Sequence, residues 1–102
     1  KVLDSYFPNP GEGPTRKKIE KGFYNLRFYI TLEDGSNAFA KVTGDMDPGY
    51  GSTSKMLAES AVCLAKDKLP NKSGVLTPSV AMGDSLLTRL EKNAGLKFSF
   101  ES

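Results

Sequence analysis

Hydrophobic and polar residues alternate most regularly between Phe23 and Leu32, and this pattern predicts a β-strand. A strand points successive side chains to opposite faces, so the alternation leaves one apolar face and one polar face. Shorter alternations predict a second strand over 37–43 and a third over 96–100. The apolar positions of the first strand are Tyr24, Leu26, Phe28, Ile30 and Leu32.

The segment Glu33-Asp34-Gly35-Ser36 between the first two strands is typical of a hairpin turn. A two-residue Asp34-Gly35 turn would place Phe28 opposite Lys41 and mix polar with apolar residues on one face. A type I turn followed by Gly35 as a left-handed bulge residue avoids this mixing. Because a slip by one residue moves every side chain to the other face, the sequence favours the bulged turn. The pairs it predicts are Leu26 with Val42, Phe28 with Ala40, and Ile30 with Ala38.

Two helices are predicted in the second half of the chain, over 48–67 and 78–93. Asp47-Pro48 and Thr77-Pro78 each combine an N-cap side chain with a proline at the first helical position, where no donor is needed. Ser52 or Thr53 is the alternative cap of the first helix. That helix is apolar on most sides, which favours a central position. The second helix ends at Gly95, and its apolar stripe consists of Val80, Leu86, Leu87, Leu90 and Ala94.

These elements predict an α+β fold, an antiparallel sheet with two helices packed on one face. Phe98 and Phe100 are expected to share the buried face with Leu26, Phe28 and Ile30. The length allows one domain, so residues 1–102 are assigned to a single unit. Within it, residues 1–22 are predicted to be an irregular loop and a short charged turn, because prolines and glycines crowd the segment 8–14.

Charge and composition narrow the range of partners and locations. The chain of 102 residues has 14 Lys and Arg against 12 Asp and Glu, and this net charge of +2 does not indicate a nucleic-acid or polybasic membrane partner. No stretch approaches the roughly 20 apolar residues of a membrane span. With one Cys no intrachain disulfide is expected, and a cytoplasmic location is favoured. The chain begins at Lys1 without a signal-peptide pattern, so it is interpreted as a piece of a longer polypeptide or a trimmed chain.

Residues that could carry catalytic chemistry are sparse. The absence of His excludes imidazole acid–base catalysis and the usual triads. Cys63 lies among the apolar helical residues Val62, Leu64 and Ala65, and a buried thiol with no nearby cation is expected there, so a raised thiol pKa and an inert thiol are expected. Asp34, Asp45 and Asp47 are too few and too scattered for a calcium loop. The catalytic residues are therefore unknown, and no residue is assigned to a cofactor or a metal.

Three segments could instead bind a ligand. Gly11-Glu12-Gly13 lacks the preceding strand and following helix of a phosphate loop, so an irregular loop is favoured. The basic run Arg16-Lys17-Lys18-Ile19-Glu20-Lys21 is interpreted as a solvated helical face with Thr15 as its N-cap. The aromatic residues near Arg27 would suit single-stranded RNA only if they faced solvent. Tyr29 alone shares the expected outer face with Arg27, so core packing is favoured for Phe23, Tyr24 and Phe28.

Several short motifs of the chain also resemble those of a known family. They are Pro10-Gly11-Glu12-Gly13-Pro14, Gly22-Phe23, Asp47-Pro48-Gly49-Tyr50, Met56-Leu57-Ala58-Glu59-Ser60-Ala61, the stretch from Gly74 to Gly83, and the Leu-rich helix, Gly stop and short Phe-bearing strand from Leu86 to Phe100. Together they resemble the C-terminal end of the saccharopine dehydrogenase-like oxidoreductases, in the branch that includes bacterial trans-acting enoyl reductases. The stretch Gly74–Gly83 is the most specific of them.

The resemblance implies that this chain is the C-terminal, substrate-side portion of a longer NAD(P)-dependent oxidoreductase. Members of the family carry an N-terminal Rossmann domain for NAD(P). The implied partner is therefore that domain of the same polypeptide, and NAD(P) is implied as cofactor of the full-length protein, with none bound by this chain.

The implied role of the chain is to supply substrate contacts or a subunit interface, which leaves a homo-oligomer open. No catalytic residue of the family can be placed on this sequence, and the chain alone is predicted to be inactive. The patterning by itself leaves a second hypothesis, a stand-alone interaction or small-ligand-binding module that uses the outer face of the sheet.

Overall fold

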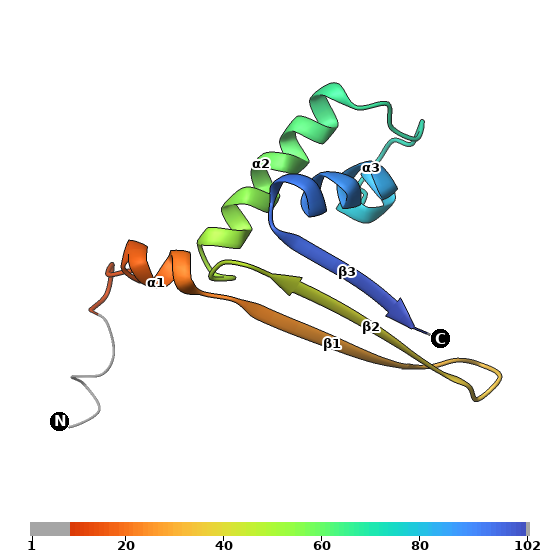
Figure 1. The fold of residues 1–102 in the computed structure, drawn as a ribbon. Helices are drawn as coiled ribbons and strands as arrows, with labels where there is room; N and C mark the ends of the chain where they lie inside the picture. The colour runs from red at the N-terminus through yellow and green to blue at the C-terminus, as the bar shows by residue number, and fades with distance from the viewer. Residues whose placement is uncertain (1–8, 102) are drawn as a thin grey trace.

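In the computed structural model, which describes residues 9–101, the chain folds into one three-stranded antiparallel sheet and three helices (Figure 1). The predicted α+β class is confirmed. The strand order is β1-β2-β3, so β2 is the central strand. In chain order the elements are α1 (Arg16–Lys21), β1 (Tyr24–Thr31), β2 (Asn37–Gly44), α2 (Gly51–Lys66), α3 (Pro78–Asn93) and β3 (Leu96–Glu101).

The hairpin of β1 and β2 has the register that a consistent apolar face predicted. Gly35 has a φ of +82°, and its N–H donates to the carbonyl of Leu32 over 3.0 Å. This is the left-handed bulge position, which glycine occupies without a steric penalty. The predicted pairs are confirmed: Leu26 with Val42, Phe28 with Ala40, and Ile30 with Ala38.

The third strand extends the same apolar face, with Phe98 opposite Val42 and Phe100 opposite Ala40. The predicted burial of this face is wrong, because Phe28 is 47% exposed and Phe100 is 63% exposed. The physical reason is the path of the helices. They lie over one end of the sheet, where α3 leads into β3, and then rise away from the strands (Figure 1). We refer below to this side of the sheet as the inner face. Its residues, of which Ala38 is buried and the others are partly or largely exposed, are Leu26, Phe28, Ile30, Ala38, Ala40, Val42, Phe98 and Phe100.

A small core lies between α2 and α3, where Cys63, Met82 and Leu86 are buried against one another. The predicted central position of the first long helix is wrong for the described chain. Leu57 and Leu64 are 72% and 58% exposed, since α3 covers only one side of α2.

The start of α2 differs from the prediction. The helix begins at Gly51 with Tyr50 as its N-cap, and the Asp47 carboxylate accepts a hydrogen bond from the Tyr50 N–H over 2.7 Å. Asp47 therefore closes a turn that precedes the helix and does not cap the helix itself. The glycines at 49 and 51 weaken a helix that would start at Pro48. The alternative caps Ser52 and Thr53 are wrong as well, because both lie inside the helix, where Ser52 is fully buried.

The predicted bounds of α3 are confirmed, with Thr77 as its N-cap, Pro78 in its first turn and Gly95 in a left-handed conformation after its C-cap. The Thr77 hydroxyl pairs with the Ser79 hydroxyl, so the expected bond to the helix backbone is not made. The helix is interrupted at Gly83, whose φ of +51° and ψ of −134° are accessible only to glycine. This kink changes the phase of the helix, so that Met82 is buried while Val80 of the predicted stripe is 43% exposed.

The molecule is open for its size. Its radius of gyration is 17.5 Å, against about 13 Å for a compact domain of 100 residues. Its accessible surface is 8235 Å², against roughly 5,700 Å² for a folded monomer of this mass. Within the described residues, the exposed side chains of Phe28 and Phe100 on the inner face are part of this excess.

No helix within residues 9–101 is long and apolar enough to cross a membrane.

Candidate functional site

An apolar cleft lies at the vertex where the helices meet the sheet. Its volume of about 370 Å³ falls in the range of small-molecule sites. One wall comes from the inner face of the sheet, and the other comes from α2, α3 and the turn before α2. The lining residues are Tyr24, Leu26, Val42, Pro48, Met56, Leu90, Leu96 and Phe98.

Within the described part of the chain, no charged residue lines the cleft, and its one side-chain polar group is the Tyr24 hydroxyl. That hydroxyl shares a hydrogen bond of 2.8 Å with the hydroxyl of the fully buried Ser52. The Tyr24 ring covers Gly44, where no side chain fits. The cleft can therefore hold and desolvate an apolar group, and these lining residues supply no free acid or base.

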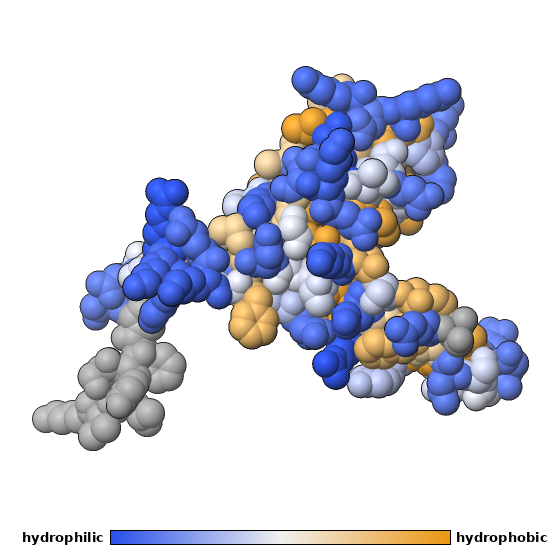
Figure 2. Space-filling model, in the orientation of Figure 1, coloured by the Kyte–Doolittle hydropathy of each residue, from blue (hydrophilic) through white to orange (hydrophobic). Residues whose placement is uncertain are grey.

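The cleft continues directly onto the exposed inner face. Figure 2 shows hydrophobic residues along the side of the sheet that looks toward the helices. The rings of Phe28 and Phe100 alone leave on the order of 200 Å² exposed, given the usual surface of a phenylalanine. Apolar patches of a few hundred Å² on a soluble protein mark binding sites or interfaces. The inner face and the cleft together form the candidate functional site.

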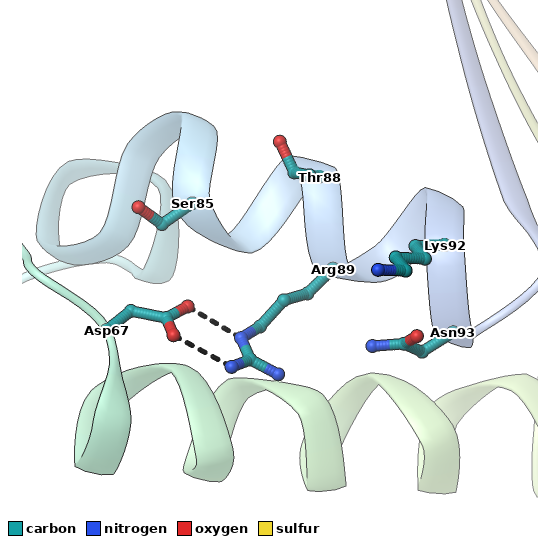
Figure 3. Close-up of a pocket in the computed structure, with 6 residues that line it drawn as sticks. All are labelled: Asp67, Ser85, Thr88, Arg89, Lys92 and Asn93. Atoms are coloured by element: carbon teal, nitrogen blue, oxygen red, sulfur yellow. Dashed lines mark hydrogen bonds and ion pairs between the residues drawn. The ribbon is translucent and has the colours of Figure 1, made fainter.

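A second, polar cavity of about 400 Å³ lies between α2 and α3 (Figure 3). Arg89 reaches from α3 to Asp67, and its Nε and Nη2 atoms donate to the two carboxylate oxygens over 2.6 and 2.7 Å. Its Nη1 atom donates to Glu59 over 3.1 Å, and the Asn93 amide donates to the same Glu59 oxygen over 3.0 Å. The cavity is lined by Asp67, Ser85, Thr88, Arg89, Lys92 and Asn93.

This network shifts the titration of its members. The hydrogen bonds from Arg89 lower the pKa of Asp67. The carboxylates of Asp67 and Glu59 in turn raise the pKa of Arg89. Burial raises the pKa of the Cys63 thiol, as expected, and Asp67 adds to that effect. The expectation that Cys63 has no cation near it is wrong, because Arg89 lies close enough to oppose the increase. Burial is the larger influence, so the thiol stays protonated.

Arg89 makes these contacts to carboxylates on or just beyond α2, so the network ties α3 to α2. Sequence reasoning missed it, because Arg89 lies 22 residues from Asp67 and 30 from Glu59. No local spacing connects such distant charges. The network therefore holds α2 and α3, which form one wall of the cleft, against each other. The Arg89 guanidinium is engaged by the two carboxylates and is not free to bind a ligand.

The basic run is an exposed helical face, as predicted. It forms α1, and Arg16 pairs with Glu20 one turn later over 2.7 Å. The Thr15 hydroxyl accepts a hydrogen bond from the Lys18 N–H, which confirms Thr15 as the N-cap. Of the predicted irregular segment, residues 1–8 lie outside the described residues. The Gly11–Gly13 segment is a local turn closed by Asn9 and Glu12.

The three aspartates considered for a metal lie in separate places. Asp34 accepts hydrogen bonds from the backbone and the hydroxyl of Ser36 in the hairpin turn, which lower its pKa. Asp45 faces Lys55 at 3.6 Å, and Asp47 closes the turn before α2. Each therefore has a local structural partner.

The outer face of the sheet carries more aromatic surface than predicted. Tyr29 is 81% exposed and lies beside Phe39, with ring centroids 5.3 Å apart. Arg27 and Lys41 are opposite each other on the same face. Phe23 is also 80% exposed, so its predicted core packing is wrong, whereas Tyr24 lines the cleft.

Comparisons with known proteins give one group of relatives. The chain is 46% identical over 85 residues to a Mycobacterium tuberculosis protein provisionally named a trans-acting enoyl reductase; the match covers 81% of this chain and 20% of that protein. It is 41% identical over 92 residues to proteins named trans-acting enoyl reductase from Mycobacterium ulcerans and Mycobacterium bovis, and these matches cover 88% of this chain and 22% of theirs.

The chain thus spans about a fifth of the length of the curated relatives it matches. These relatives support the resemblance to trans-acting enoyl reductases that the motifs indicated. No protein-family model matches the chain. No solved structure matches it either.

Proposed function

We propose that this chain is the C-terminal, non-nucleotide-binding part of a saccharopine dehydrogenase-like, NAD(P)-dependent oxidoreductase, and that it contributes substrate contacts there. The observation that carries the proposal is the apolar cleft that opens onto an uncovered apolar sheet face. The relatives named enoyl reductase, of which the chain matches about a fifth, supply the reaction class. The site lies in the cytoplasm under this proposal.

The cleft suits the hydrocarbon part of an enoyl substrate. Its walls would exclude water from the substrate and orient it, which lowers the entropic cost of reaction. The inner face beyond the cleft would pack against the N-terminal Rossmann domain of the same polypeptide. The open shape of the described chain favours this arrangement over a stand-alone module, because a domain that folds alone covers its apolar face.

The described residues do not fit NAD(P). A dinucleotide site places its pyrophosphate on backbone N–H groups at a helix N-terminus, after a glycine-rich turn that follows a strand. At the start of α2 the Asp47 carboxylate already accepts from the Tyr50 N–H and would repel an anion. At the start of α3, Pro78 removes a donor. We therefore propose that the cofactor, which supplies hydride transfer, is held elsewhere in the polypeptide.

Calorimetric titration of the 102-residue chain with NADPH and with NADH is expected to show no binding, and the chain alone is expected to be inactive. The same titration of the polypeptide with its Rossmann domain is expected to show binding. Micromolar affinity of the short chain for either cofactor would contradict this division of roles.

In that longer polypeptide, Met56→Trp is expected to raise the KM for an enoyl substrate with a long hydrocarbon chain by roughly tenfold or more, as occurs when a pocket loses room for apolar groups. Met56 lines the cleft, whereas its neighbour Leu57 points outward and is 72% exposed. Leu57→Trp is therefore the matched control and should leave the KM unchanged. The affinity for NADPH should be the same in both variants. Equal KM values for the two variants would exclude the cleft as the substrate site.

A further inference from the structure

We draw no further inference here: the strongest candidate, the outer face of the sheet with the exposed Tyr29 ring and the directly opposed cations Arg27 and Lys41, carries nothing, because the chain spans about a fifth of the length of its relatives and nothing in the structure shows what covers this face.

Discussion

Replacing Gly44 with alanine is expected to lower the free energy of unfolding by about 2 kcal/mol, the usual effect of overpacking a filled site. Gly44 is buried at the end of β2, directly opposite Tyr24. A Cβ atom at this position would collide with the Tyr24 ring and hydroxyl. The ring would have to leave its place in the cleft and give up its hydrogen bond to Ser52. The buried Ser52 hydroxyl would then lack a partner, which adds to the loss.

Urea denaturation of the chain measures this effect, with Gly49→Ala as the control. Gly49 lies in the turn before α2, and the nearest atom to a new Cβ there is 3.4 Å away. A double variant sharpens the test. If the cost arises from the ring, Gly44→Ala should cost much less in a Tyr24→Ala background than alone. The same cost in both backgrounds would mean that the ring of Tyr24 is not what excludes a side chain.

The hairpin was predictable because its information is local. The alternation from Phe23 to Leu32 and the Asp34-Gly35 signal each restrict the register, and both restrictions agree only for the bulged turn. The bounds of α3 were predictable for the same reason, since Thr77-Pro78 and Gly95 mark its ends. Agreement between independent local signals is what made these predictions succeed.

The exposed inner face could not be predicted from the same pattern. Alternation shows that Phe28 and Phe100 belong to an apolar face, but it does not show what covers that face. The burial prediction assumed that the cover lies within this chain. The helices instead pack on each other around Cys63 and Met82 and reach the sheet at one end. The apolar cleft follows from that angle between the elements, for which the sequence has no local signal.

The start of α2 shows two local signals in conflict. Asp47-Pro48 is a strong N-terminal signal, whereas the glycines at 49 and 51 oppose a helical first turn. In the structure Asp47 uses its side chain to close a turn to Tyr50, and the helix begins only at Gly51. Because the helix begins at Gly51 and not at Pro48, Ser52 lies where its hydroxyl can bond to Tyr24 beneath the cleft. Sequence reasoning could identify both signals but not their balance.

Replacing Arg89 with methionine is expected to lower the melting temperature at neutral pH by several degrees. Arg89 bonds to Asp67 and Glu59 at once, and the methionine would leave both carboxylates without their cation. The aliphatic side chain retains much of the volume of the arginine stem, so the loss reports mainly the hydrogen bonds and ion pairs. The exposed pair of Arg16 and Glu20 is the control, because surface pairs contribute little, and Arg16→Met should change the melting temperature only slightly.

The pH dependence of the Arg89 effect has a defined sign. Arg89 lowers the pKa of Asp67 in the folded chain below its ordinary value of 3.8. The resulting stabilisation is therefore present above pH 3.8 and is lost as the pH falls through the lower, folded-state pKa. In thermal melts from neutral pH to well below 3.8, the parent should lose stability more steeply in acid than Arg89→Met, so the two curves converge. Asp67→Asn should flatten the acid dependence in the same way, while Asp34→Asn should remove only the share that belongs to the hairpin turn. A constant difference between parent and Arg89→Met across this range would show that Asp67 is not the group through which Arg89 stabilises the two helices.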